Sequence, residues 1–283
     1  MSQITKLAGV CGWPIHQSLS PVLHNYWLRE SGIAGAYIPF AVREDEAERA
    51  FRSLLKTSIA GVNVTMPLKE IAFQSADEVT EDAQKLGVAN CLYKRDGRLI
   101  AHNTDMEGFA APLLQHVKAT DLAKSTVLII GAGGAAKAVI GALLSLGVPE
   151  IRVTNRNDAK AADLVAMADL PSLYAVPWAE RHESLRSADI VVNSSAGGMA
   201  GKPPLDFDLT NAPDTAFIYD LIYTPRMTPL LKAAKRQKLA YLGGLDMLIA
   251  QAKPSFRLFY GTNPKAGSDP TEVLLSALKS GQR

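Results

Sequence analysis

Residues 126–139 read TVLIIGAGGAAKAV, and this stretch decides the fold. Residues 127–130 form a continuous apolar run, as expected for a strand buried on both faces of a parallel sheet. Gly131, Gly133 and Ala136 follow at the positions of the fingerprint G-x-G-x-x-G/A. A helix rich in Ala and Leu follows as far as Leu146, and its N-terminal N–H groups would point at a phosphate. The order of strand, glycine turn and helix predicts dinucleotide binding; the alternative is a glycine-rich turn that binds nothing.

The glycine turn supplies the first candidate cofactor-binding residues. A glycine permits the tight turn, a second one lets the backbone approach a pyrophosphate, and a small third residue lets the helix lie close to the strand. We therefore expect the phosphates to contact the run Gly131, Ala132, Gly133, Gly134 and Ala135.

Size and composition limit the function classes. The chain has 283 residues, which suggests two domains, and 47% of them are hydrophobic and 20% charged, as in an ordinary globular protein. A net charge of +2 without a dense basic tract argues against nucleic acid as a partner. No apolar run reaches membrane-spanning length, and the N-terminus lacks the features of a signal peptide. Cys11 and Cys91 form neither a metal-binding spacing nor a disulfide pattern. These features predict a cytoplasmic α/β protein.

Apolar periodicity and turn residues predict the order of elements. In the first half we expect strands at 6–11, 37–42 and 59–64, a hairpin over 91–102, and helices at 20–31, 44–56 and 103–117. Further strands are expected at 150–154, 188–193 and 217–221, alternating with helices at 159–168 and from Thr228. This alternation predicts a Rossmann-type, doubly wound parallel sheet. We expect an N-terminal α/β substrate domain over 1–110, a dinucleotide domain over 111–244, and a helical tail over 245–283 that breaks near Pro254 and could return to the first domain.

The end of the second strand of the dinucleotide domain indicates which cofactor binds. An acidic residue there would hydrogen-bond the adenosine ribose, but this chain has Asn155 and Arg156, with Lys160 soon after. Cations at this position suit a 2′-phosphate and favour NADP over NAD, although Asp158 weakens that preference. The alternative is that Arg156 and Lys160 are simply solvated.

Polar residues in the first half follow strands or begin helices. Ser18 and Ser20 could donate to a carboxylate, although helix capping alone would explain Ser20. Asn63 and Thr65 follow a strand, and Lys69 could act as a general acid/base at the same sheet edge. Taken singly, Asn90 is an ordinary turn residue and Asp105 an ordinary helix cap. The five histidines show no metal spacing, and we predict no metal site.

Together these clusters resemble the shikimate dehydrogenase family nearly end to end. The motif G-x-P-I/V followed by S-x-S-P-x-x-H-N occurs from Gly12 to Asn25, N-V-T-x-P-x-K from Asn63 to Lys69, and N-T-D-x-x-G-F from Asn103 to Phe109. Later segments resemble the family's N-R-T, N-x-T-x-x-G-M, D-x-x-Y-x-P-x-x-T and final glutamine motifs; they begin at Asn155, Asn193, Asp220 and Gly244.

The resemblance implies a substrate domain joined to an NADP domain, with roles for individual residues. Ser18 and Ser20 would hold the shikimate carboxylate, helped by Tyr223. Lys69 and Asp105 would be the catalytic pair, with the lysine passing a proton as hydride moves between the nicotinamide and the ring carbonyl carbon. Other ring-hydroxyl contacts would come from Thr65, Asn90 and Gln251, and further cofactor contacts from Leu221 and Gly244.

Several positions depart from the family pattern, and rival functions remain. Cys91 stands where the family usually has Thr after Asn90, and Leu68 replaces a common polar residue before Lys69. Asn157 replaces the Thr of N-R-T. Gly243 and Asp246 alter the last motif. By the resemblance, Ser20 favours shikimate over quinate, because quinate-preferring relatives often carry Thr at this position. We expect a reversible NADP-dependent shikimate dehydrogenase of the aromatic amino-acid pathway, as a monomer or homodimer. The rivals are a quinate/shikimate or aminoshikimate dehydrogenase that uses NAD, a catalytically idle ligand-binding relative, and a folate-pathway dehydrogenase.

Overall fold

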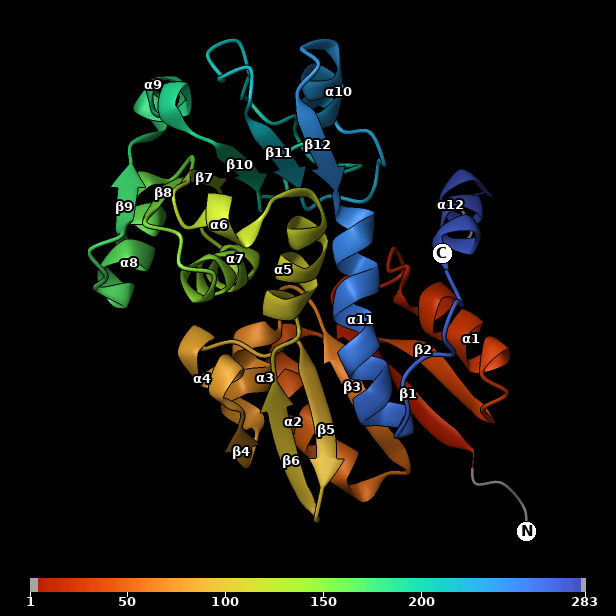
Figure 1. Ribbon diagram of the computed structural model, residues 1–283. Helices are drawn as coiled ribbons and strands as arrows, with labels where there is room; N and C mark the ends of the chain where they lie inside the picture. The colour runs from red at the N-terminus through yellow and green to blue at the C-terminus, as the bar shows by residue number, and fades with distance from the viewer. Residues whose placement is uncertain (1–4, 281–283) are drawn as a thin grey trace. The chain divides into compact units, whose positions relative to one another are not determined.

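The computed structural model describes residues 5–280, which fold as two compact units (Figure 1). Unit 1 contains the chain up to Asp105 and again from Ile249 onward, and unit 2 is Met106–Leu248. The chain crosses between the units twice, at the start of helix α5 (Asp105–His116) and inside helix α11 (Gly244–Tyr260). These divisions lie a few residues from the expected boundaries at 110 and 244.

Unit 1 is built on a mixed six-stranded sheet of order β2-β1-β3-β5-β6-β4. The first three strands in the sheet run parallel, β5 is antiparallel to both β3 and β6, and β4 runs parallel to β6. The strands are β1 (Lys6–Gly12), β2 (Gly35–Ala41), β3 (Ile59–Val64), β4 (Glu78–Val79), β5 (Cys91–Arg95) and β6 (Arg98–His102).

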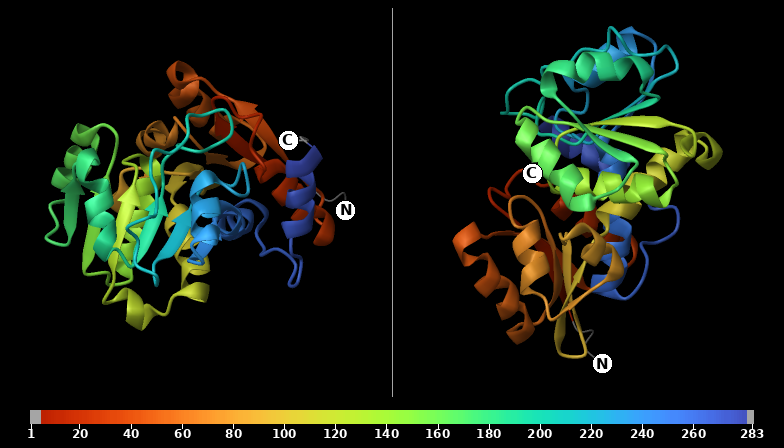
Figure 2. Two further views of the ribbon diagram at one scale, coloured as in Figure 1. Left: turned by 90° about the horizontal axis from the view of Figure 1, so that it is seen from above. Right: turned by 90° about the vertical axis from the view of Figure 1, so that its left-hand side faces the viewer.

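Helices cover both faces of this sheet (Figure 2). One face carries an aliphatic core that includes Val62, Val64 and Leu92. The other carries stacked rings, with His24 parallel to Tyr37 at 4.0 Å between centroids. The helices of the unit are α1 (Ser20–Glu30), η1 (Glu44–Glu46), α2 (Ala47–Ser53), η2 (Leu54–Lys56), α3 (Lys69–Ser75), α4 (Glu81–Leu86) and α12 (Thr271–Ser280).

The C-terminal tail packs on unit 1. Lys6 Nζ donates to the carbonyl of Tyr260 at 2.6 Å, and Trp27 Nε1 donates to the carbonyl of Ser268 at 3.1 Å. Gly61 in β3 shows how closely α11 approaches, because a Cβ atom there would fall 2.5 Å from the ring of Phe259. Any larger side chain at Gly61 would push the helix away from the sheet.

Unit 2 is a wholly parallel six-stranded sheet of order β12-β11-β10-β7-β8-β9. The strand order reverses between β7 and β10, which is where such sheets bind ligands beyond their carboxyl ends. The strands are β7 (Thr126–Ile130), β8 (Glu150–Thr154), β9 (Leu173–Val176), β10 (Ile190–Asn193), β11 (Phe217–Asp220) and β12 (Ala240–Gly243). The helices are α6 (Ala119–Leu122), α7 (Gly134–Ser145), α8 (Asp158–Ala168), η3 (Trp178–Glu180), α9 (Arg181–Ser184), η4 (Leu185–Ser187) and α10 (Pro229–Arg236).

Strand β7 is buried on both faces, as its apolar run predicts. Val127 and Ile129 belong to one core, Leu128 and Ile130 to the other, and each is at most 1% exposed. Because successive side chains of a strand alternate between faces, a continuous apolar run feeds both cores at once. Helices lie on both sides of the sheet (Figure 2), so the doubly wound fold is confirmed.

Some expected details of secondary structure are wrong. Helix α11 does not break near Pro254 but runs through it. The single helix expected over 44–56 is divided into η1, α2 and η2. Ser20 is the first residue of α1 rather than its cap, which is Leu19. Strands β4, β9 and β12 were not expected; each has four residues or fewer.

Candidate active site

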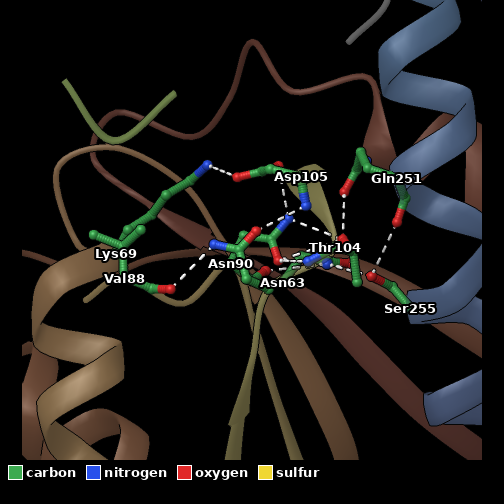
Figure 3. Close-up of polar contacts among 9 residues, drawn as sticks. Asn63, Lys69, Val88, Asn90, Thr104, Asp105, Gln251 and Ser255 are labelled. Atoms are coloured by element: carbon green, nitrogen blue, oxygen red, sulfur yellow. Dashed lines mark hydrogen bonds and ion pairs between the residues drawn. The ribbon is translucent and has the colours of Figure 1, made fainter. Parts of the chain in front are cut away.

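Lys69 and Asp105 form an ion pair in unit 1 (Figure 3). Lys69 begins α3, which follows β3 after a turn closed by the hydrogen bond from Leu68 N to the Thr65 carbonyl. Asp105 begins α5, where the positive end of the helix dipole favours a carboxylate. The Nζ–Oδ2 distance is 2.5 Å, and the side chains are 17% and 8% exposed. Two residues far apart in the sequence thus meet as a mostly buried charge pair.

Asn90 fixes the orientation of the Asp105 carboxylate. Its Nδ2 donates to Asp105 Oδ1 at 2.7 Å and to Thr104 Oγ1 at 2.9 Å, and its Oδ1 accepts from Thr104 N at 2.8 Å. The backbone N–H of Asp105 donates to Asn103 Oδ1 at 2.9 Å, and Asn103 Nδ2 donates to the Val88 carbonyl. One carboxylate oxygen therefore faces Asn90 and the other faces Lys69, so the pair has one defined geometry.

Further buried polar side chains hold the backbone of Asn90 in place. Asn63 Nδ2 donates to the Asn90 carbonyl at 3.2 Å and to Ser255 Oγ at 2.8 Å. The buried Tyr37 hydroxyl donates to Asn63 Oδ1 at 2.8 Å. These contacts join β2, β3 and α11, which explains why buried polar groups are tolerated there.

Of the other residues of unit 1 expected at the site, Gln251 contacts this network directly. The Thr104 hydroxyl donates to Gln251 Oε1 at 3.4 Å, which brings α11 to the network. Thr65 follows β3, and its N–H donates to the Cys11 carbonyl. Ser18 lies half-buried in the loop after β1, and its Oγ accepts from Ser20 N at 3.3 Å. Ser20 itself is 7% exposed.

Lys69 and Asp105 are the two ionisable side chains among the eight residues labelled in Figure 3. Neighbouring groups are held neutral by burial. The pKa of Cys91 is raised to about 12, and the pKa of Tyr37 is raised well above its usual value. Among residues 5–280, Asp105 is the one hydrogen-bond partner that the structure gives Lys69 Nζ. An ammonium has three N–H donors, so it can donate to a ligand while it stays paired.

In unit 2, the glycine turn after β7 has the geometry of a phosphate-binding loop. Gly131 has φ +114°, and a Cβ there would fall 2.8 Å from Ser194 Oγ, so the two strand ends approach closely. Gly133 is the N-cap of α7, and the space beside it where a Cβ would lie is open. Ala136 is fully buried where α7 packs on the sheet. The tight turn, the open approach and the close helix fit a pyrophosphate at the N-terminus of α7.

A cavity of about 210 Å³ adjoins this turn at the carboxyl end of the sheet. Asn155 and Arg156 line it, whereas Lys160 is exposed on α8 and is not among its lining residues. Asp158 does not line it either, because its carboxylate accepts the Trp178 N–H at 2.7 Å. The lining residues are Ile130, Gly131, Asn155, Arg156, Trp178, Ser195, Ala196, Gly197, Lys202, Pro203 and Leu205.

The other expected residues of unit 2 follow β11 and β12. Leu221 and Gly244 are close neighbours, because a Cβ at Gly244 would fall 2.0 Å from the Leu221 carbonyl oxygen. Tyr223 is half-buried in the loop after β11. Asp220 anchors that loop: its carboxylate accepts from Asn193 Nδ2, Thr228 Oγ1 and the Ile222 N–H.

Sequence reasoning missed Ser255, Trp178 and Lys202 as parts of these two sites. Ser255 follows the proline that was expected to break the helix, which hid its position on α11. Trp178 and Lys202 lie in connections after β9 and β10. Connections that follow parallel strands meet at one edge of the sheet. This rule would have located Lys202 after the expected strand at 188–193, and it would have located Trp178 if β9 had been recognised.

Two negative findings apply to residues 5–280. No group of three or more His, Cys, Asp or Glu side chains is placed to hold a metal ion. In the same range, no helix has both the length and the apolar character needed to cross a membrane.

Two family models match the chain. The model described as the shikimate dehydrogenase substrate binding domain matches residues 10–92, and the model described as shikimate / quinate 5-dehydrogenase matches residues 113–200. The shikimate dehydrogenase (NADP(+)) of Paramagnetospirillum magneticum is 41% identical over 277 residues, which cover 98% of this chain and 100% of the relative. That of Azorhizobium caulinodans is 39% identical over 273 residues, 96% of this chain and 97% of the relative.

Solved structures agree over nearly the whole length. Shikimate 5-dehydrogenase from Thermus thermophilus in complex with NADP(H) and shikimate has a TM-score of 0.83 at 32% identity, covering 97% of this chain and 99% of that one. Quinate dehydrogenase from Corynebacterium glutamicum in complex with NAD has a TM-score of 0.85 at 27% identity, with the same coverage. Family models, relatives and structures agree with the motifs: this chain belongs to the shikimate dehydrogenase family.

Proposed function

We propose that the protein is an NADP-dependent shikimate dehydrogenase that reversibly reduces 3-dehydroshikimate to shikimate. The observation that carries the proposal is the Lys69–Asp105 pair, which is mostly buried and fixed by Asn90. Such a pair suits a carbonyl reduction, because negative charge develops on one oxygen and a positioned ammonium can both stabilise and protonate it.

In this proposal Lys69 donates a proton from Nζ to the oxygen of the ring carbonyl as the carbonyl carbon is reduced. NADPH, when bound, would supply the hydride to that carbon. Asp105 keeps the ammonium aimed at the oxygen through its Oδ2 contact, and Asn90 prevents the carboxylate from rotating away. Lys69 regains its proton from water. In the reverse direction the neutral amine takes the hydroxyl proton while hydride leaves the ring carbon.

The substrate's other groups are assigned by position around the pair. We assign contacts with the ring hydroxyls to Thr65, Asn90 and Gln251; Asn90 and Gln251 belong to the observed network. Ser18 and Ser20 offer hydroxyls at the start of α1 for the carboxylate, with Tyr223 as a further contact. Apart from Tyr223, the residues that we assign to the substrate lie in unit 1, and those that we assign to NADP lie in unit 2.

The preference for NADP is supported by the chemistry at the end of β8. Arg156 lines the cavity beside the glycine turn, and no Asp or Glu is among the residues that line it. NAD-binding folds of this type place an acid there, which would repel a 2′-phosphate. Leu221 and Gly244 are assigned to the nicotinamide end of the cofactor.

The test is an absorbance assay at the nicotinamide wavelength that crosses shikimate and quinate with NADP and NAD. Fast reduction of NADP with shikimate, and slow reduction in the other three combinations, is the expected result. Turnover mainly with quinate or NAD would move the protein to the quinate/shikimate subfamily. Binding of NADPH without turnover in any combination would identify a catalytically idle relative and contradict the proposal.

A further inference from the structure

The cavity beside the glycine turn is lined by a lysine that belongs to no cofactor motif. Lys202 lines it together with Arg156 and reaches it from the connection between β10 and β11. Arg156 Nη2 donates to the Pro204 carbonyl at 2.7 Å, so its guanidinium lies against the same short segment that carries Lys202. The two positive side chains therefore face one space from two different connections.

Neither cation is neutralised by the protein. Among residues 5–280, the structure shows no ion pair for Arg156 or Lys202, and none of the cavity-lining residues is acidic. The acidic residue nearest to Arg156 in the sequence is Asp158, and its carboxylate accepts a hydrogen bond from the Trp178 N–H. Two like charges beside one cavity repel each other, and a bound dianion removes that repulsion.

The segment that carries Lys202 is braced rather than loose. Arg181 Nε and Nη2 donate to the carbonyl and carboxylate of Asp206 at 3.1 and 2.9 Å, and Nη1 donates to the Trp178 carbonyl at 2.7 Å. The Arg181 guanidinium also lies 4.5 Å from the centre of the Trp178 ring. At 13% exposure, the Arg181 side chain ties two walls of the cavity together. Lys202 therefore projects from a wall whose position is already set, which lowers the cost of binding.

We propose that Lys202 and Arg156 together bind the 2′-phosphate of NADP, and that Lys202 is a specificity-determining residue of this enzyme. This inference rests on the proposed use of NADP. A ribose 2′-phosphate carries nearly two negative charges at neutral pH, which matches two cations rather than one. The cavity is smaller than the roughly 300–1,000 Å³ typical of sites for whole ligands, and so suits one end of a dinucleotide.

The structure separates Lys202 from the cation that the sequence favours. Lys160 lies on the exposed surface of α8 and does not line the cavity. The sequence groups Arg156 with Lys160, four positions later, whereas the cavity is lined by Arg156 and by Lys202 from the connection after β10.

The experiment measures binding, not turnover, by calorimetry on the full-length protein. Two probes that differ by a single group, adenosine 2′,5′-bisphosphate and adenosine 5′-monophosphate, are compared on the wild type and on Lys202→Gln, Lys160→Gln and Lys235→Gln. Lys235 is an exposed lysine of α10 and serves as the charge-matched control. Circular dichroism and the melting temperature check that each variant is folded.

We expect the wild type to prefer the bisphosphate, and Lys202→Gln to reduce that preference roughly tenfold, as the loss of one charge-assisted contact would. Affinity for the monophosphate should not change, and the Lys235 variant should resemble the wild type. An unchanged preference in Lys202→Gln, an equal loss for both probes, or a loss confined to Lys160→Gln overturns the inference while leaving NADP use intact. A wild type that binds both probes equally overturns the NADP assignment as well.

Discussion

At the scale of single residues, Lys69 allows a direct test of the chemistry. Lys69→Ala should lower kcat by about 10²–10⁴-fold, the usual contribution of a positioned general acid, and change KM far less. Steady-state rates with shikimate and NADP measure both constants. Lys85→Ala, which removes an exposed lysine paired with Glu81 on α4, is the matched control.

Stability must be measured alongside the rates. Removing Lys69 leaves Asp105 mostly buried without its partner, and breaking a buried pair costs about 3–5 kcal/mol. Rates are therefore taken well below the variant's melting temperature. A folded Lys69→Ala protein with near-normal kcat would contradict the catalytic role of the lysine.

The burial of His24 predicts how the free energy of unfolding depends on pH. Its ring is fully buried, stacks on Tyr37, and has no hydrogen-bond partner for either nitrogen within the described residues. Burial lowers the pKa of His24 to about 3, from 6.5 in an exposed histidine. The unfolded chain therefore binds this proton below pH 6.5 while the folded chain does not, so stability is lost as the pH falls from 6.5 toward 3.

His24→Phe should remove this particular loss, because phenylalanine keeps a stacking ring and does not titrate. The difference in unfolding free energy between variant and wild type should shift in favour of the variant by roughly 2 kcal/mol between pH 6.5 and 5, at about 1.4 kcal/mol per pH unit. Urea unfolding at several pH values measures the difference, and carboxylates that titrate in both proteins cancel. Parallel curves for the two proteins would show that the imidazole can be protonated in the folded state.

At the scale of elements, the sequence predicted what periodicity and turn chemistry encode. The apolar run of β7, the glycine turn and α7 all form as expected, because each is specified locally. The short edge strands β4 and β12 were missed, since two to four residues with no buried run give no periodic pattern. Their pairing with neighbours from elsewhere in the chain creates them.

Pro254 shows tertiary packing overriding a local preference. Proline removes one backbone hydrogen bond inside a helix, which made a break the natural expectation. Helix α11 continues because the turn around it is held on unit 1: Ser255 accepts from Asn63, and Phe256 packs edge-on against Trp27. The motifs name candidate site residues and pair Lys69 with Asp105, but they do not predict the contacts that Asn90 and Asn63 make around that pair. Lys202 and Arg156 line the same cavity because the connections after β8 and β10 meet at one edge of the sheet. No local sequence pattern encodes which connections meet there.

At the scale of the whole molecule, each unit has cores of its own. The aliphatic core of unit 1 lies entirely within residues 11–101, and the two cores of unit 2 lie within residues 109–247. Burial of apolar area is the main stabilising term, so each unit carries most of its own stability. The covalent links between the units lie at the start of α5 and inside α11.

This organisation predicts that a ligand confined to unit 2 stabilises unit 2 alone. Adenosine 2′,5′-bisphosphate at 100 times its dissociation constant should add about 2.7 kcal/mol to the unfolding free energy of unit 2, a rise of roughly 5–10 °C in its transition. Hydrogen exchange near the melting temperature can follow β3 and β7 separately. Protection should increase in β7 and stay unchanged in β3. Shikimate is the contrasting ligand, because most of the residues proposed to bind it lie in unit 1, so it should increase protection in β3. Equal protection of both strands by the nucleotide would mean that α5 and α11 couple the units into one cooperative structure, and the cores would not be energetically separate.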